Sequence, residues 1–104
     1  KKEEALHELE VVTVQDPSAD HVFELGALYA EHGDRARAMA AFEKVISLDN
    51  TQIRARWQLA SLYEETGRLS DALTQLRLVA ASVPTNTAVQ KRLQVLEQQV
   101  GQLR

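Results

Sequence analysis

Apolar side chains recur along most of the chain at intervals of three and four residues, the spacing of one face of an α-helix. Gly, Pro, Asp, Asn and Ser stand between these stretches, where they end helices and begin turns. The pattern predicts helices over about residues 3–15, 20–32, 35–48, 52–66, 69–82 and 86–100. The sequence therefore predicts an all-α fold.

The same spacing assigns an inward face to the predicted helices. Ser18 or Asp20 is the expected N-cap of the second helix, and Asp34 that of the third, because their side chains can accept hydrogen bonds from the first turn. The inward positions are Ala5, Leu6, Leu9, Val12; Val22, Leu25, Leu28, Tyr29; Ala38, Met39, Ala41, Phe42, Val45, Ile46; Ala72, Leu73, Leu76, Val79, Ala80; Val89, Leu93, Leu96, Val100 and Leu103.

Three glycines have predicted structural roles. Gly33 and Gly67 each follow a predicted helix and precede another, which favours a left-handed residue with positive φ in a short turn. Gly26 lies inside a helix, where glycine costs about 1 kcal/mol relative to Ala. A close approach by the paired helix is the expected reason for it.

Part of the chain repeats. The segment Leu-Gly-Ala-Leu-Tyr-Ala-Glu-His-Gly at residues 25–33 returns at residues 59–67 as Leu-Ala-Ser-Leu-Tyr-Glu-Glu-Thr-Gly, with five identical positions 34 residues apart. The same interval relates Ala38 to Ala72 and Val45 to Val79. A fixed period of this length predicts stacked structural units.

The repeated residues resemble the tetratricopeptide repeat (TPR) pattern of Leu, a small residue and an aromatic in a first helix, then Ala and Phe in a second, then Pro. The pattern departs at Val22 and Arg56, where an aromatic is usual, and at Asn50, where Pro is usual. The matching residues are Leu25, Gly26, Tyr29, Ala38 and Phe42, then Leu59, Ala60, Tyr63, Ala72, Leu76 and Pro84. The resemblance implies an α-solenoid of antiparallel helix hairpins that binds other proteins.

On this basis residues 1–104 are expected to form one domain, with repeats at residues 19–52 and 53–86. Residues 3–17 resemble the second helix of a preceding repeat, so the chain is expected to be part of a longer array or to begin with an unpaired helix. Residues 87–103 are expected to cap the solenoid, since glutamines crowd the outer surface of this helix. A coiled coil is the alternative, although the seam spans only about two heptads.

Composition and charge limit the classes of function and the locations that the chain can have. Net charge is −3, and residues 1–52 carry eleven acidic and five basic side chains whereas residues 53–104 carry four and seven. No basic stripe with interleaved aromatics indicates nucleic-acid binding, and the apolar runs are too short for a membrane span. Cysteine is absent, which leaves the compartment open. A cytoplasmic location is favoured, with a periplasmic or membrane-tethered one open if an upstream segment was removed.

No catalytic, metal or cofactor site is expected. His7, His21 and His32 lie on different segments without metal-ligand spacing. The adjacent acidic pairs point to different helix flanks, so they form no facing carboxylate dyad, and no glycine-rich phosphate loop is present. The sequence therefore predicts a binding protein and not an enzyme.

The resemblance implies a concave groove lined by the first helices of successive repeats. The positions matching that surface are Phe23, Ala27, Ala30, Arg54, Trp57, Gln58, Ser61, Lys91 and Arg92. Phe23 and Trp57 are 34 residues apart, so we expect them to form an apolar floor flanked by Arg54, Gln58 and Lys91, for a partner peptide or helix with apolar and acidic groups. The alternative is that Trp57 packs in the core, in place of the usual aromatic at Arg56.

One subfamily is not favoured. Co-chaperone members bind acidic C-termini through a clamp of Lys, Asn, Asn, Lys and Arg. The matching positions here are Phe23, Ala27, Gln58, Ala88 and Arg92, of which only Arg92 agrees.

Self-assembly is the rival function. The first helix would expose Leu6, Leu9 and Val12, the last would offer Leu93, Leu96 and Val100, and the two halves carry opposite charge. A dimer or head-to-tail homo-oligomer through these terminal helices is the alternative to a protein or peptide partner.

Overall fold

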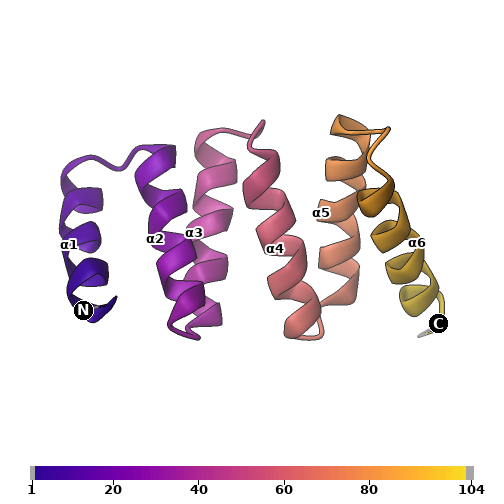
Figure 1. The fold of residues 1–104 in the computed structure, drawn as a ribbon, viewed down its shortest axis with the longest axis horizontal. Helices are drawn as coiled ribbons and strands as arrows, with labels where there is room; N and C mark the ends of the chain where they lie inside the picture. The colour runs from indigo at the N-terminus through magenta and orange to yellow at the C-terminus, as the bar shows by residue number, and fades with distance from the viewer. Residues whose placement is uncertain (1, 103–104) are drawn as a thin grey trace. The chain divides into compact units, whose positions relative to one another are not determined.

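The computed structural model describes residues 2–102, which form helices and connections and no strand (Figure 1). The helices are α1 (Lys2–Gln15), α2 (Ala19–Glu31), α3 (Arg35–Leu48), α4 (Ile53–Glu65), α5 (Leu69–Ser82) and α6 (Thr87–Gln102). This confirms the all-α prediction, and each helix end lies within two residues of its predicted position. Leu103, predicted to face inward, lies outside the described residues.

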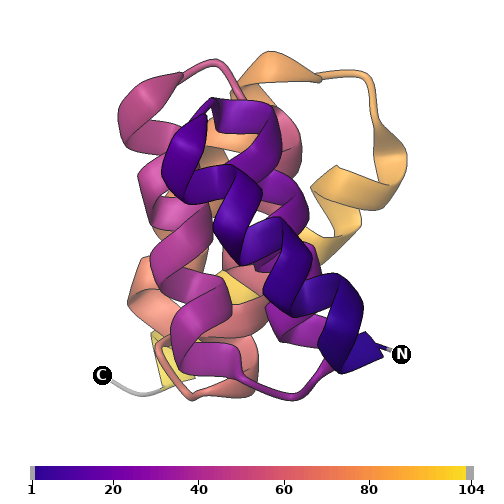
Figure 2. The same ribbon diagram turned by 90° about the vertical axis from the view of Figure 1, so that its left-hand side faces the viewer.

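The chain forms two compact units that divide between Ala55 and Arg56, in the first turn of α4. The first unit, called unit 1, contains α1, α2 and α3, with α1 at the front in Figure 2. The second, called unit 2, contains most of α4 together with α5 and α6. The predicted boundary between the two repeats lies just before this division.

The two predicted glycine turns have the same hydrogen bonds. Gly33 has φ of 78° and Gly67 has φ of 79°. The N–H of Gly33 donates to the carbonyl of Ala30 at 3.0 Å, and the next N–H donates to the carbonyl of Tyr29 at 2.9 Å. The equivalent bonds at Gly67 measure 3.1 and 2.7 Å. Both are Schellman motifs, which end a helix with a left-handed residue.

Replacement of Gly67 by Val should lower the free energy of unfolding by about 1–2 kcal/mol, because a β-branched residue is strained at positive φ. A Cβ at this position meets nothing within 4 Å, so the cost comes from the backbone. Gly67→Asn should lose less, since Asn tolerates this conformation. Urea unfolding measures both, and Gly101→Ala is the control because its added methyl also meets open space. Equal stability of Gly67→Val and the wild type would contradict the assignment.

Gly26 has the expected packing role. A Cβ built on it would lie 3.0 Å from Cε1 of Phe42 and 3.2 Å from Cβ of Ala41, closer than ordinary van der Waals contact. Glycine therefore lets α2 approach α3 closely enough for the Phe42 ring to pack against the α2 backbone.

The core follows most of the predicted inward positions. Phe42 and Val45 in unit 1 are fully buried, as are Leu76 and Leu96 in unit 2. Ser18 caps α2 by accepting a hydrogen bond from the N–H of His21, and Asp34 caps α3 in the same way. The remaining predicted core positions on α2, α3 and α5 are buried or half-buried.

The inward face predicted for α1 is partly wrong. Leu6 and Leu9 are half-buried, but Val12 is 41% exposed and Ala5 is also exposed. Thr13 turns inward instead, at 9% exposure, and its hydroxyl donates to the carbonyl of Leu9 at 2.7 Å. This bond satisfies the hydroxyl, so burial of a polar residue here carries little penalty.

The apolar seam of α6 is covered within the chain. Leu96 is fully buried, Val100 is 8% exposed and Leu93 is half-buried, with α6 packed against α5. This burial agrees with the predicted inward positions and leaves no free seam for the rival expectation of self-assembly. Self-assembly through them would require α6 to leave its own unit.

A hydrogen bond joins α1 to α2. The hydroxyl of Tyr29 donates to Oε2 of Glu10 at 2.6 Å. Burial raises the pKa of Tyr29 above its ordinary value of 10.0, and the bond to Glu10 raises it further. The folded state therefore favours the neutral phenol. The resulting contribution to the free energy of unfolding is complete below the pKa that Tyr29 has in the unfolded chain, and it is lost as pH rises through the pKa of the folded state.

Tyr29→Phe should reduce the loss of stability at alkaline pH. Urea unfolding between about pH 9 and pH 11 brackets the ordinary tyrosine pKa and measures this difference. Tyr63 is present in both proteins, so the comparison isolates Tyr29. An identical pH dependence in the two proteins would show that the Tyr29 hydroxyl makes no such contribution.

Candidate functional site

Phe23 stands on α2 with its ring half-buried. The ring packs edge-to-face on Phe42, with centroids 5.3 Å apart and an interplanar angle of 62°. The guanidinium carbon of Arg54 lies 4.6 Å from the Phe23 centroid, within the range of a cation–π contact. Because Phe42 is fully buried, Phe23 packs against a ring that the surrounding core holds in place.

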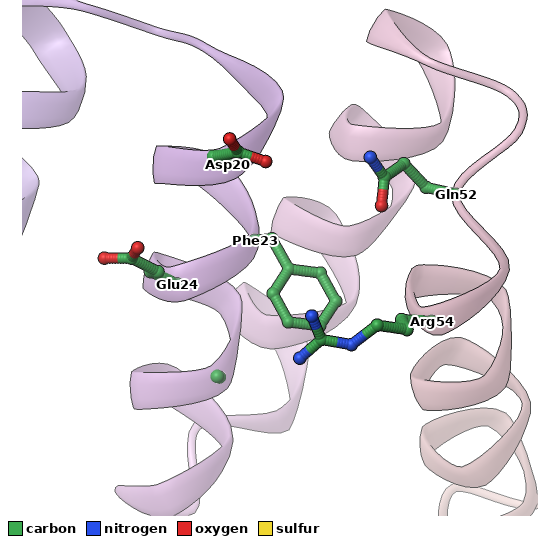
Figure 3. Close-up of a pocket in the computed structure, with 6 residues that line it drawn as sticks. Asp20, Phe23, Glu24, Gln52 and Arg54 are labelled. Atoms are coloured by element: carbon green, nitrogen blue, oxygen red, sulfur yellow. The ribbon is translucent and has the colours of Figure 1, made fainter.

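An open hollow of about 470 Å³ surrounds this ring (Figure 3). Its lining comprises Asp20, Phe23, Glu24, Ala27, Gln52 and Arg54. Phe23, Ala27 and Arg54 were expected in the groove from the sequence, and unit 1 brings these three together. Figure 3 shows the Arg54 guanidinium meeting the ring that projects from α2.

The sequence reasoning missed Asp20, Glu24 and Gln52. Helical spacing could have found the two acids, since Asp20 lies three residues before Phe23, and Glu24 three before Ala27, on neighbouring positions of one helix. Gln52 belongs to the connection before α4, where its side-chain amide donates to Oδ2 of Asp49 at 3.2 Å. A contact made by a residue in a connection does not recur at the helical or the repeat spacing, so the sequence gives no periodic signal for it.

Hydrogen bonds also hold the rest of this connection. The hydroxyl and the backbone N–H of Thr51 donate to Oδ1 of Asp49 at 2.6 and 3.0 Å. These bonds, with the one from Gln52, lower the pKa of Asp49. An ionised Asp49 therefore fixes the connection that carries Gln52 to the edge of the hollow.

Unit 2 has a second aromatic–arginine pair. Trp57 on α4 is half-buried, and the guanidinium carbon of Arg92 on α6 lies 5.5 Å from its ring centroid. Nη2 of Arg92 also donates to the carboxylate of Glu64. Arg92 thus neutralises a carboxylate of its own chain, which further disfavours a role in a carboxylate clamp. Its pairing with Glu64 was not predicted from the sequence.

Four other predicted groove residues have less defined surroundings. Gln58 and Lys91 are exposed, and Ser61 and Ala30 are half-buried. None of the four lines the hollow in unit 1. The partial exposure of Trp57 keeps it available to a partner, and its assignment to the groove stays a prediction.

The described part of the chain offers no group of three His, Cys, Asp or Glu side chains that could hold a metal ion. Within residues 2–102 no helix has the length and apolar character needed to cross a bilayer. The geometry provides a contact surface, made of the Phe23 ring packed on Phe42, charged side chains and an open hollow.

A profile of the tetratricopeptide repeat family matches residues 29–96, which is most of the chain. The chain belongs to the tetratricopeptide repeat family. This confirms the resemblance noted in the sequence. No curated protein is similar enough in sequence to count as a relative.

Solved structures share the TPR fold. The type III secretion chaperone SycD of Yersinia enterocolitica, in complex with a peptide of the translocator YopD, is 20% identical, with a TM-score of 0.85 over 95% of this chain and 82% of that one. An alternative dimer of SycD is 20% identical, with a TM-score of 0.83 over 95% and 81%. A thermophilic TPR protein of Thermus thermophilus is 28% identical, with a TM-score of 0.78 over 93% of this chain and 50% of that one.

Proposed function

We propose that this TPR chain is a protein-interaction scaffold that binds a peptide or helix of a partner protein through its groove residues. The observation that carries the proposal is the anchored, half-buried Phe23 in an open hollow of about 470 Å³. Aromatic residues with a fixed base and an accessible face are typical binding anchors, because they contribute contact area with little loss of conformational entropy.

Two further observations support this function. Unit 2 presents a comparable half-buried aromatic, Trp57, at the position 34 residues after Phe23. SycD, which has the same fold, is solved with a peptide of another protein. The partner class proposed here is therefore a polypeptide that presents apolar side chains to Phe23 in unit 1 or to Trp57 in unit 2.

Selection from a random-sequence peptide display library tests the proposal without a known partner. Synthetic copies of the selected peptides would be titrated by fluorescence anisotropy against the wild type and Phe23→Ala. Leu78→Ala is the control, because it truncates an accessible apolar residue that lies outside the hollow, on α5. We expect Phe23→Ala, and not Leu78→Ala, to weaken binding. Peptides that bind all three proteins equally would contradict the proposal.

Self-association is the second candidate, favoured by the exposed valines of α1. Val14 is 83% exposed and Val11 is 46% exposed, which is unusual for two apolar residues on one helix. SycD has been solved as an alternative dimer. Val11 and Val14 join Val12, which is 41% exposed, as candidate contacts. Leu6 and Leu9 are less suitable, since those two are half-buried against their own unit.

If α1 mediates self-association, sedimentation velocity should show a species that grows with concentration. Val11→Lys with Val14→Lys should abolish it, because two buried charges without partners oppose association. Leu78→Lys is the control on α5. A monomer at all concentrations up to about millimolar, where even weak dimers are populated, would remove this candidate.

A further inference from the structure

The charges around Phe23 indicate which sign of charge a partner segment would carry. The hollow contains two carboxylates, those of Asp20 and Glu24, and one guanidinium, that of Arg54. Both acids are exposed, and neither forms an ion pair with any residue that the structure describes. Arg54 is already engaged over the face of Phe23. This contact leaves the guanidinium charged, but the two carboxylates outnumber it, so the net charge of the lining is negative.

We infer that the unit 1 hollow selects a partner segment that carries a Lys or Arg beside an apolar side chain. This inference rests on the proposed function. The apolar side chain would contact Phe23 and the methyl of Ala27, and the basic group would pair with Asp20 and Glu24. These acids are four residues apart on α2 and so are neighbours on the helix surface. The Glu24 carboxylate points away from the Phe23 ring in Figure 3, and rotation of this exposed side chain would let both acids share one cation.

The wider charge distribution agrees with this polarity. Residues 1–52 carry eleven acidic and five basic side chains, so the surroundings of the hollow also attract a cation. The sequence had suggested the opposite sign, with acidic partner groups near Arg54. The inference departs from that expectation in unit 1 because two acids that the sequence analysis did not assign to the hollow outnumber Arg54 in its lining.

The test compares two charge-neutralised proteins. Asp20→Asn with Glu24→Gln removes both carboxylates of the hollow. Glu4→Gln with Glu8→Gln is the matched control, because it removes two exposed acids at the same spacing, also beginning in the first turn of a helix, away from the hollow. The probes are synthetic, fluorescein-labelled copies of peptides selected on the wild type whose binding depends on Phe23.

We expect these peptides to be enriched in Lys or Arg beside an apolar residue. The Asp20→Asn/Glu24→Gln protein, called the hollow variant, should bind them about two- to tenfold more weakly, the range for loss of two exposed ion pairs. The control variant should bind like the wild type. The difference should shrink as salt is raised from low to physiological strength. Thermal melting of both variants checks that neither change acts through unfolding.

Two outcomes would overturn the inference and leave the proposed function intact. One is a set of Phe23-dependent peptides enriched in Asp or Glu; the other is equal affinity of the hollow and control variants. A selection that returns no Phe23-dependent or Trp57-dependent peptide removes the proposed function as well. Replacing the basic residue of a selected peptide by Gln provides the reciprocal check, since it should weaken binding to the wild type and not to the hollow variant.

Discussion

Replacement of Phe42 by Ala should lower the free energy of unfolding by about 3–5 kcal/mol, the usual cost of removing a buried aromatic ring. Phe42 is fully buried, packs against the backbone of α2 at Gly26 and supports Phe23 from below. The loss is a large share of the total stability of so small a protein, which is about 5–15 kcal/mol. Urea unfolding followed by circular dichroism measures it.

A milder pair of substitutions tests the contact between Gly26 and Phe42. One of them, Gly26→Ala, should change stability in opposite directions in two backgrounds. The second repeat carries Ala60 and Leu76 at the positions of Gly26 and Phe42, and both are fully buried. The first repeat therefore has a small residue with a large one, and the second has two of intermediate size. Gly26→Ala with Phe42→Leu converts the first pair into the second.

In the wild type, Gly26→Ala should destabilise the protein, because the new methyl would lie 3.0 Å from the fully buried Phe42 ring, which would have to shift. In the Phe42→Leu background the ring atoms are gone, so the helix propensity of Ala should dominate and add up to about 1 kcal/mol. The coupling in this double-mutant cycle should therefore be favourable. Additive effects, or an equal gain in both backgrounds, would contradict the packing role of Gly26.

The regular part of the fold could be predicted from the sequence because several local signals agree. Along α3 and α5, apolar spacing, a glycine before the helix and a turn residue after it all indicate the same boundaries. The 34-residue period then predicts that both helices pack in the same way. Local and tertiary requirements coincide at these positions, which is expected of a sequence that specifies one fold.

The first helix shows where this reasoning stops. The run Glu-Val-Val-Thr-Val at residues 10–14 places apolar residues on several faces, so its spacing does not define one inward side. The buried hydroxyl of Thr13 donates a hydrogen bond to Leu9, and a bond between Tyr29 and Glu10 links the helix to α2. A contact such as that between Tyr29 and Glu10 joins residues far apart in sequence, so it leaves no periodic signal in the sequence.

The candidate site was predictable in its aromatic residues and not in its charges. Phe23, which lines the hollow, was assigned together with Trp57 because the two recur at the repeat interval, and the assignment of Trp57 stays a prediction. The engagement of Arg54 by Phe23 and of Arg92 by Glu64 joins residues that are distant along the chain. The charge that a hollow offers to a ligand depends on such pairings, which the repeat interval does not predict.

Replacement of Trp57 by Ala should weaken peptide binding by at least about thirtyfold, which corresponds to roughly 2 kcal/mol. The half-buried ring has a free surface for a partner, while the Arg92 guanidinium covers part of it. The cost to stability should lie below the about 3–5 kcal/mol of a fully buried aromatic, since less of the ring is removed from water. The helical circular dichroism spectrum should therefore be retained.

Affinity and melting temperature measured on the same proteins distinguish the two roles of Trp57. Trp57→Phe should recover most of the affinity if the ring is a contact, because an aromatic of smaller size keeps the apolar surface. Leu78→Ala controls for loss of an exposed apolar residue elsewhere in unit 2. A folded Trp57→Ala protein with unchanged affinity would remove Trp57 from the binding surface, and an unfolded one would assign it to the core, because only a side chain that supports the packing of α4 can unfold the unit when it is truncated.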